Sequence, residues 1–340
     1  MLACLLNESN RIELRQVPTP RLDRGDALVK MEACGICGTD LEKIDGRLGA
    51  GGILGHEVSG TIQQAPEYMK EYAPGDRVVA HHHVPCYNCS TCLRGDPTLC
   101  PQFKKTNIDP CGIAASFRVP RYNVERGALI HLPNELSLEE GAMIEPTACC
   151  IRAIRRAKLK DNDNVLIVGL GPTGLTQVQI LRERTSGKII GTDIIESRLR
   201  MGSKLGADKT LDPLAENVSE TVKKMTGAGA DLALVSTGNE KALDQAFGSV
   251  RKGGKVLLFG APAVGAQHRL DVSTLFSGQI SLISSYSCVE PEMHEAIRLV
   301  SDKRIDVGSL ISDRYKLEEA EEGLEYAKTS RTAIKTIITA

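Results

Sequence analysis

The sequence predicts an α/β protein with two domains, in which a mostly β region precedes a region of alternating strands and helices. Before about residue 134, short β-rich runs are separated by Gly, Pro and Asp, as at Ala27–Ala33, Val58–Ile62 and Arg77–Ala80. From about residue 161 strands alternate with helices, which is typical of a doubly wound parallel sheet. At 340 residues, the chain is long enough for two cores.

The composition is that of an ordinary globular protein. Charged residues make up 25% of the chain and the formal net charge is −1, so the charge does not favour nucleic acid or an anionic membrane as a partner. No stretch approaches the roughly 20 apolar residues of a membrane span, and no apolar run follows a basic start. We therefore expect a cytoplasmic protein with neither kind of partner.

A helix-capping signal marks the end of the first region. Ser137 and Glu140 fit a capping box, in which each side chain accepts a hydrogen bond from a backbone N–H at the start of a helix. Pro146 cannot lie inside that helix, and it biases the preceding residue away from helical backbone. We therefore expect a break at Glu145 and a second helix from Pro146 to Arg156.

The second region is predicted to contain strands separated by helices. The first three elements are a buried strand, a helix and a second strand, at Asn164–Gly169, Leu175–Arg184 and Lys188–Asp193. The same strand pattern returns at Ala230–Ser236 and Lys255–Gly260.

The end of the chain is expected to rejoin the first domain. After about residue 289 it contains an amphipathic helix, Met293–Ser301, and a short terminal strand, Ala333–Thr339. We therefore expect residues 1–150 and 290–340 in one domain and residues 151–289 in the other.

Four cysteines form a dense group of metal-binding residues with the spacing C-x2-C-x2-C-x7-C: Cys86, Cys89, Cys92 and Cys100. Four thiolates brought together by tight turns match the closed tetrahedral site of a structural Zn²⁺. Free thiols and an iron–sulfur cluster are the alternatives. The other cysteines of the eleven are scattered, which favours metal binding over disulfides. Histidines 81–83 just before the cluster cannot converge on one ion, because successive strand residues point to opposite faces.

A glycine-rich turn lies between the first strand and the first helix of the second region. Its letters are G-L-G-P-T-G, comprising Gly169, Gly171, Pro172, Thr173 and Gly174. In this context the glycines let a dinucleotide pyrophosphate approach the helix N-terminus. The alternative is an ordinary turn between a strand and a helix.

An acidic residue then follows at the distance that a dinucleotide site requires. Asp193 ends the next strand, where its carboxylate can bind ribose hydroxyls and would repel a 2′-phosphate. NAD is therefore expected over NADP, although Arg198 is a nearby cation that could weaken this preference. Thr237 and Gly260 end later strands and are candidates to line the nicotinamide, although glycine at a strand end is commonly part of a turn.

A second set of metal-binding residues has the character of a reactive site. Cys37 and His56 are common Zn²⁺ ligands, and a catalytic zinc needs about three protein ligands with one position open. Glu57 and Glu145 are the candidates for the remaining ligand. We prefer Glu145, at the expected helix break, with Glu57 as a ligand or as a partner of one.

These motifs resemble those of zinc-dependent members of the medium-chain dehydrogenase/reductase family, close to the branch of polyol (sorbitol) and threonine dehydrogenases. The matching segments follow the family order over nearly the whole chain: G-I-C-G-T-D, G-H-E-V-S-G, G-D-R-V-V, the four cysteines, Glu145-Pro146 and G-L-G-P-T-G. The resemblance implies a GroES-like β-barrel catalytic domain built from both chain ends. It also implies an inserted Rossmann NAD-binding domain and an active site in the cleft between the two.

The same resemblance implies roles for individual residues. Cys37, His56 and Glu145 fall on catalytic zinc positions, and Glu57 falls on a residue that ligates or supports the metal in some members. Thr39 falls on the family's Ser or Thr that contacts the substrate hydroxyl and passes on its proton.

Two features depart from the family pattern. Glu42 stands where relatives often have a histidine of the proton path, and the loop Gly46–Ile53 is short and glycine-rich. The substrate of better-known relatives therefore cannot be assigned to this chain.

We expect an NAD-dependent dehydrogenase with two zinc ions per chain, one catalytic and one structural. Its expected substrate is a secondary alcohol such as a polyol, sugar or related hydroxy compound. The alternatives are a threonine-type or simple secondary alcohol dehydrogenase and, more remotely, a non-catalytic NAD-binding protein on the same fold. The family implies a homo-oligomer, either a dimer or a tetramer.

Overall fold

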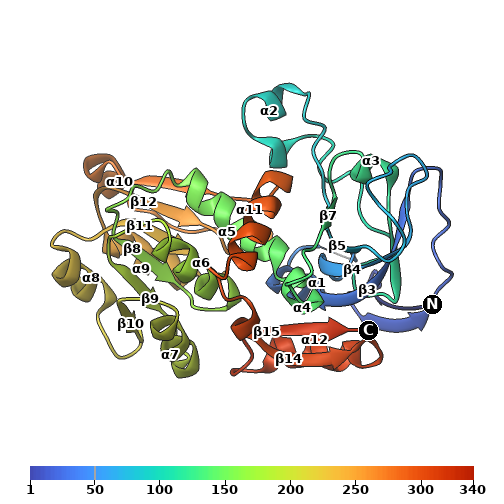
Figure 1. Cartoon of the computed structure of the whole chain (residues 1–340). Helices are drawn as coiled ribbons and strands as arrows, with labels where there is room; N and C mark the ends of the chain where they lie inside the picture. The colour runs from blue at the N-terminus through green and yellow to red at the C-terminus, as the bar shows by residue number, and fades with distance from the viewer. Residues whose placement is uncertain (50) are drawn as a thin grey trace. The chain divides into compact units, whose positions relative to one another are not determined.

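The computed structural model describes residues 1–49 and 51–340, and it divides into two compact units (Figure 1). Unit 1 comprises Met1–Ala148, Ser287–Lys303 and Val307–Ala340, whereas unit 2 comprises Cys149–Tyr286 and Arg304–Asp306. Both ends of the chain therefore belong to unit 1. Ala50, in the short glycine-rich loop Gly46–Ile53, lies outside the described residues.

Unit 1 is built on a sheet with the order β14-β15-β3-β4-β5-β7, and β6 pairs with β3 outside this path. Its strands are β3 (Ala27–Gly35), β4 (Glu57–Gln64), β5 (Arg77–Ala80), β6 (Ser116–Val119), β7 (Leu129–His131), β14 (Ile311–Lys316) and β15 (Lys335–Thr339). The C-terminal strand β15 pairs antiparallel with β3, so that Ile338 lies opposite Cys34. The last strand of the chain therefore lies beside the strand that leads into C-G-I-C-G-T-D.

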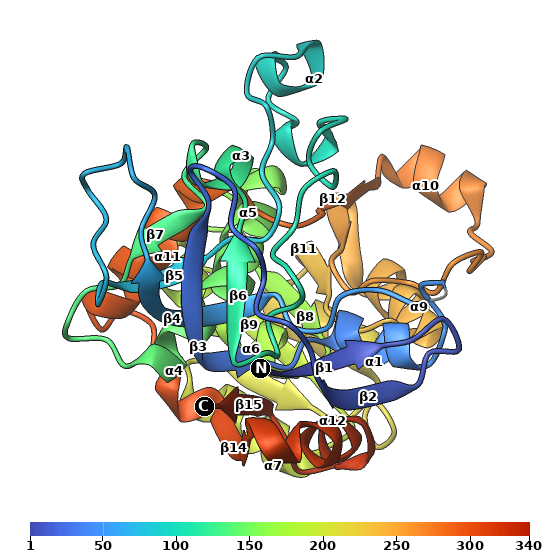
Figure 2. The ribbon, with the colours of Figure 1, turned by 90° about the vertical axis from the view of Figure 1, so that its right-hand side faces the viewer.

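Shorter elements surround this sheet. The strands β1 (Leu2–Leu6) and β2 (Ile12–Gln16) form a separate antiparallel pair. The helices are α1 (Gly38–Ile44), α2 (Ser90–Leu93), α3 (Arg121–Val124), α4 (Leu138–Ala142), α11 (Glu290–Ser301) and α12 (Ala320–Thr329), with 3-10 turns η1 (Pro97–Leu99), η2 (Gly308–Leu310) and η3 (Leu317–Glu319). The helix α2 lies in an arm that extends away from the sheet (Figure 2).

The predicted capping box is confirmed, but the helix break lies earlier than expected. Glu140 accepts a hydrogen bond from the backbone N–H of Ser137, whose hydroxyl accepts one from the N–H of Glu140. The next helix, α5 (Ile144–Arg156), begins two residues before Pro146. The first turn of a helix accepts proline, because an N–H there has no partner within the helix. Glu145 therefore lies inside the first turn of α5.

Unit 2 contains a six-stranded parallel sheet with the order β10-β9-β8-β11-β12-β13. Its strands are β8 (Val165–Val168), β9 (Ile189–Thr192), β10 (Lys209–Leu211), β11 (Ala230–Val235), β12 (Val250–Leu258) and β13 (Ser281–Ser284). Connecting helices are α6 (Pro172–Arg182), α7 (Glu196–Lys204), α8 (Val218–Thr226), α9 (Glu240–Ser249) and α10 (Val272–Gly278). In chain order the strands run 3-2-1-4-5-6, which is the Rossmann order, with its ligand-binding crevice between the first and fourth strands.

The prediction of a doubly wound sheet is therefore confirmed, with some shifts in its elements. The strand β10 was not predicted, and β12 begins at Val250 rather than Lys255. The strand β8 is completely buried because helices cover both faces of such a sheet. Among the residues that the structure describes, no helix has both the length and the apolar character needed to cross a membrane.

Candidate active site

Cys37 lies at the turn between β3 and α1, where it is the N-cap of the helix. Its backbone N–H donates a hydrogen bond to Asp40 Oδ2 at 3.1 Å. This contact satisfies a backbone donor at the start of a helix, where such groups lack intrahelical partners. Thr39 is half-buried in the first turn of the same helix. The local sequence C-G-T-D therefore fixes the thiol of Cys37 and the hydroxyl of Thr39 on one short helix.

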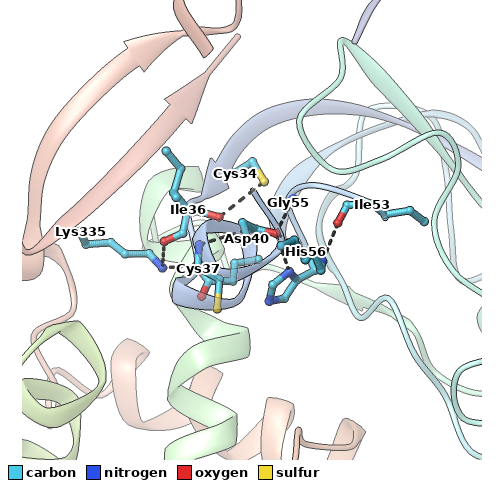
Figure 3. Close-up of polar contacts among 11 residues, drawn as sticks. Cys34, Ile36, Cys37, Asp40, Ile53, Gly55, His56 and Lys335 are labelled. Carbon is cyan, nitrogen blue, oxygen red and sulfur yellow. Dashed lines mark hydrogen bonds and ion pairs between the residues drawn. The ribbon is translucent and has the colours of Figure 1, made fainter. Parts of the chain in front are cut away.

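Asp40 is completely buried and orients His56 (Figure 3). Its Oδ1 lies 3.5 Å from His56 Nδ1 and accepts a hydrogen bond from the N–H of Gly55 at 3.2 Å. Burial acts to raise the pKa of Asp40, but His56 and Lys43 outweigh it and lower the pKa to about 2. Asp40 is therefore an anion that holds Nδ1, which leaves Nε2 as the imidazole nitrogen available to a metal.

Glu57 begins β4, and its carboxylate forms an ion pair with Lys335 of β15. Both side chains are 2% exposed, and the Lys335 ammonium also donates a hydrogen bond to the backbone oxygen of Ile36 at 2.9 Å (Figure 3). Burial acts to lower the pKa of Lys335, but the charges of Glu57 and Cys37 raise it above its ordinary value. A side chain at Gly35 would collide with the Glu57 carboxylate, so this pair needs glycine there.

Cys37, His56 and Glu57 together form a cluster whose donor atoms all lie within 4.8 Å of one another. Burial acts to lower the pKa of His56, but the negative charges of Asp40 and Cys37 raise it well above its ordinary value. The surroundings therefore favour positive charge at this point. Thiolate, imidazole and carboxylate are all zinc ligands, and three protein ligands are the number that a catalytic zinc would take, with its fourth position left to water or substrate. The residues present fit the expected metal.

Glu145 belongs to a different group of metal-binding side chains. Its carboxylate lies within 4.8 Å of donor atoms of His81 and Cys288, and all three residues are buried. The structure thus groups Glu57, rather than Glu145, with Cys37 and His56. Glu145 as a direct ligand of the Cys37 site remains a prediction. The group around Glu145 was not predicted, because its members lie in three separate segments.

The three consecutive histidines follow β5 outside the strand, and the ring of His82 lies 5.6 Å from that of His81 and 4.1 Å from that of His83. The ring of His82 lies 4.8 Å from the ring of His56, whereas His83 Nδ1 is 3.2 Å from the backbone oxygen of Thr106. Burial lowers the pKa of His81 to about 3, so this imidazole is neutral. Of the three, His82 is thus the one whose ring packs against a residue of the Cys37 cluster.

The four predicted cysteines of the arm converge around a single point. The Sγ atom of Cys86 lies 4.0 Å from that of Cys92 and 3.5 Å from that of Cys100. The Sγ atom of Cys89 lies 3.5 Å from that of Cys92 and 3.8 Å from that of Cys100. Tetrahedral thiolates around Zn²⁺ lie about 3.8 Å apart, given Zn–S bonds of about 2.3 Å. A hydrogen bond from the backbone N–H of Cys92 lowers the pKa of Cys89 to about 6, which favours its thiolate. The arm therefore fits a closed zinc site.

The glycine-rich turn of unit 2 has the geometry of a phosphate cradle. A Cβ on Gly174 would collide with the backbone oxygen of Gly169, so the helix packs this closely on the strand only with glycine there. A Cβ on Gly171 would instead point into open space. Pro172 and Thr173 then begin α6, whose first N–H groups are available to an anion. The turn therefore fits a dinucleotide pyrophosphate.

Asp193 lies directly after β9 and contacts this turn. Its Oδ2 accepts a hydrogen bond from the N–H of Leu170 at 2.8 Å, and its Oδ1 accepts one from the N–H of Ile195 at 3.0 Å. Arg198 Nη1 lies 3.8 Å from Asp193 Oδ2. The predicted acid is therefore fixed beside the glycine-rich turn, together with the one predicted cation.

Thr237 and Gly260 lie together at the carboxyl ends of their strands. A Cβ on Gly260 would approach the backbone of Thr237 to 2.6 Å, and a Cβ on Gly169 would lie 3.3 Å from the Thr237 Cβ. All three residues follow neighbouring strands of the parallel sheet. The sheet edge that carries the glycine-rich turn thus also holds both candidates for the nicotinamide side.

Two protein-family models match most of this chain. The alcohol dehydrogenase GroES-like domain matches residues 23–131, and the zinc-binding dehydrogenase model matches residues 172–302. A sorbitol dehydrogenase from Bacillus subtilis is 31% identical over 336 residues, which cover 96% of this chain and 93% of the relative.

Solved structures agree over the whole chain. A protein described as a zinc-binding dehydrogenase from Sinorhizobium meliloti, bound to NADP, has a TM-score of 0.90 and 26% identity, covering 100% of this chain and 99% of that one. An alcohol dehydrogenase from Thermus sp. ATN1 has a TM-score of 0.88 and 27% identity, with the same coverage.

Proposed function

Because the chain belongs to the zinc-binding dehydrogenase family, we propose that it oxidises a secondary hydroxyl of a polyol or a related sugar compound to a ketone. The protein is an NAD-dependent oxidoreductase. The observation that carries the proposal is the cluster of Cys37, His56 and Glu57, which offers three zinc ligands. Thr39 follows Cys37 by two positions in the chain. The likeness to a sorbitol dehydrogenase supports a polyol over other alcohols.

We assign the reactive zinc to Cys37, His56 and Glu57. A zinc ion held there would supply a Lewis acid that lowers the pKa of a coordinated hydroxyl. Asp40 holds His56 Nδ1, and Lys335 holds the Glu57 carboxylate, so two of the three ligands are oriented by buried charges. Such partners typically change metal affinity or activity by about 10- to 100-fold.

Thr39 is the residue that we assign to proton transfer. Its hydroxyl would accept the proton of the substrate hydroxyl at Oγ1 and pass it to solvent. Glu42, on the same helix, lies 3.3 Å from Arg47 in an ion pair. Relatives often have a histidine of the proton path at the position of Glu42. Because Glu42 pairs with Arg47 instead, we propose that protons leave the site by another route.

The cofactor site is assigned to unit 2. Gly169, Gly171 and Gly174 would receive the pyrophosphate, Asp193 the adenosine ribose, and Thr237 and Gly260 the nicotinamide side. NAD supplies the hydride acceptor of the reaction. Arg198 beside Asp193 would reduce the repulsion of a 2′-phosphate, so we propose a preference for NAD that is not absolute.

We further propose that residues 1–150 and 290–340 form the catalytic domain and residues 151–289 the cofactor domain. We also propose a cytoplasmic homo-oligomer, either a dimer or a tetramer. Its support is the edge strand β13, near which Phe276, Leu282 and Tyr286 are 85%, 46% and 45% exposed. Light scattering of the wild type and of Leu282→Lys tests this: the variant should have the smaller mass, and equal masses would contradict it.

The function is tested by an NAD-reduction screen with zinc-loaded protein over polyols, sugars, diols, simple secondary alcohols and threonine. The highest kcat/KM is expected for a polyol, and Cys37→Ser should abolish turnover while NAD binding persists. Turnover of threonine or a simple alcohol alone would replace the polyol by the alternative substrate. No turnover with any of them would favour a non-catalytic NAD-binding protein.

A further inference from the structure

Unit 1 has an open cavity of about 520 Å³ beside the four-cysteine arm. It is lined by Cys86 and Tyr87 of the arm, by residues 125–127 just after α3, and by Glu290 at the start of α11. A Cβ on Gly127 would lie 3.4 Å from the Glu290 Cγ, so the segment after α3 lies directly against the start of α11. Small-molecule sites usually have volumes of about 300–1,000 Å³. Three separate segments thus enclose a space that is large enough for a small molecule.

Arg126 brings a positive charge to one wall of this cavity. Its guanidinium carbon lies 3.6 Å from the centre of the Tyr122 ring, and Nη1 donates a hydrogen bond to the Tyr122 backbone oxygen at 3.1 Å. Its Nε is buried and has no hydrogen-bond partner among the described residues. The Glu125 carboxylate lies 3.9 Å from Nη1, but it already accepts hydrogen bonds from Arg121 at 2.6 Å and from Tyr68 at 3.0 Å. The side chain of Arg126 is therefore fixed, while its charge is incompletely paired.

Glu290 brings a carboxyl group to the opposite side of the same cavity. Its Oε2 is buried and has no hydrogen-bond partner within the described part of the chain. Burial raises the pKa of Glu290 to about 7, Glu292 adds to this effect, and no cation of the described residues lowers the pKa. An acidic group that lacks a partner in a buried place is costly to the fold. The cavity thus holds an acid and a base that are both incompletely satisfied.

A structural ion pair does not account for these two groups. Arg126 and Glu290 line one cavity, yet each keeps a buried atom without a partner. A molecule with an anionic acceptor and a cationic donor would satisfy both, because hydrogen bonds between ionised groups are the strong ones. A carboxylate and an ammonium on neighbouring atoms are the defining groups of a free α-amino acid. The two charges therefore suit a zwitterion better than a simple anion or cation.

Tyr87 adds an aromatic surface to this cavity. It is 36% exposed, and its φ of 60° lies in the left-handed region. Glycine adopts that backbone at no steric cost, whereas a residue with a Cβ is strained there. A tyrosine at such a position indicates that its side chain has a use. Its ring offers a face on which a large apolar side chain of a ligand can pack.

We propose that this cavity binds a free α-amino acid with a large apolar side chain. The ligand places its carboxylate on Arg126, its ammonium on Glu290 and its side chain on the Tyr87 ring. The cavity contains none of the residues that we assign to the reactive zinc or to the cofactor. The amino acid is therefore a ligand of the protein and not its substrate.

Calorimetric titration of the zinc-loaded, full-length protein with L-phenylalanine tests this assignment. The wild type should show saturable binding at one site per chain. The analogue 2-phenylethylamine lacks the carboxylate, and 3-phenylpropanoate lacks the ammonium. Each should bind at least about tenfold more weakly, because each loses a hydrogen bond between charged groups. Absence of saturable binding of L-phenylalanine, or equal binding of either analogue, would overturn the proposal even if no variant folds.

Matched variants then locate the ligand. Arg126→Gln and Glu290→Gln should each weaken binding of L-phenylalanine by at least about tenfold. Glu125→Gln is the control, because Glu125 lines the same cavity but is already paired with Arg121 and Tyr68. This control should bind as the wild type does. Wild-type affinity in Arg126→Gln and in Glu290→Gln would show that the cavity is not the site.

A last variant separates this cavity from the reactive zinc, which an amino acid could also bind through its amine and carboxylate. Cys37→Ser, which removes a ligand of that zinc, should bind L-phenylalanine as tightly as the wild type does. Loss of binding in Cys37→Ser would move the ligand to the reactive zinc, and the proposal would be wrong. None of these readouts involves turnover, so a failure of the proposed dehydrogenase function would not alter them.

Discussion

The four-cysteine arm and the Cys37 cluster are both zinc-type sites, but they are assembled in different ways. The arm takes all four ligands from a short segment, in which Cys86 and Cys100 are 14 positions apart. The Cys37 cluster combines three kinds of donor, and Lys335, which holds Glu57, lies 278 positions from it. A closed site can therefore be encoded locally, whereas the open site depends on the folding of the whole of unit 1.

The two sites also differ in charge. Four thiolates outweigh the double charge of a zinc ion and occupy all of its positions, so the arm cannot act as a Lewis acid. One thiolate and one carboxylate only balance that charge, and Lys335 offsets the additional negative charge of Asp40. A zinc ion held by the Cys37 cluster would therefore stay electrophilic and could act on a bound hydroxyl.

The largest expected effect comes from removing the thiolate of the open site. Cys37→Ser should abolish measurable turnover, a loss of at least about a thousandfold in kcat/KM, because the Lewis acid contributes several kcal/mol and each 1.4 kcal/mol is about tenfold. NAD affinity, measured by titration calorimetry, should stay unchanged because the cofactor residues lie in unit 2. Full activity in this variant would remove the distinction between the two sites.

The next effect tests the ion pair between Lys335 and Glu57 beside the Cys37 cluster. Lys335→Met should lower kcat/KM by about 10- to 100-fold, because it leaves the buried Glu57 carboxylate without its partner. Loss of a cation beside the cluster makes deprotonation of a bound hydroxyl harder, so the acid limb of the pH profile should move up by about one unit. Lys335→Arg, which keeps the charge, is the control. An unchanged limb in Lys335→Met would show that Lys335 only packs.

Loss of the zinc in the four-cysteine arm should lower stability and leave turnover intact. Cys89→Ser should release the structural zinc and unfold the arm locally, since metal binding of this kind contributes about 10 kcal/mol or more to folding. Turnover at low temperature should survive, and activity should be lost at a lower temperature than in the wild type. Limited proteolysis within residues 86–100 and thermal inactivation measure these changes. Immediate loss of turnover at low temperature would assign the arm a catalytic role.

The smallest effect concerns the choice of cofactor. Asp193→Gly should lower the ratio of kcat/KM for NAD over NADP by about tenfold, because one charged contact is worth about 1.5–3 kcal/mol and Arg198 already offsets part of it. Arg198→Ala should shift the ratio towards NAD. An unchanged ratio in both variants would show that other residues distinguish the two cofactors.

The parts of the molecule that could be predicted from sequence are those with local signals. The capping box, the glycine-rich turn and the four cysteines each have their chemistry within a few residues, and the structure has each in the expected form. The start of α5 was misplaced because proline in a first turn does not mark where a helix begins. The short strand β10 has too few residues for a period of its own.

The partners of the donors could not be predicted in the same way. Nothing near Glu57 in the sequence indicates Lys335, although a lysine within an apolar terminal strand suggests a buried partner. The convergence of His81, Glu145 and Cys288 depends on how three distant segments pack. Sequence spacing finds ligands that are near in the chain, whereas packing decides which distant donors meet.

The central claim is that the Cys37 cluster, and not the arm, supports hydride transfer from a secondary carbinol to NAD. The most direct measurement uses a polyol deuterated at its carbinol carbons, with mass spectrometry of the NADH that forms. The wild type and Cys89→Ser should both give deuterated NADH at low temperature, whereas Cys37→Ser should give none. Deuterated NADH from Cys37→Ser, or none from the wild type with any polyol, would contradict the claim.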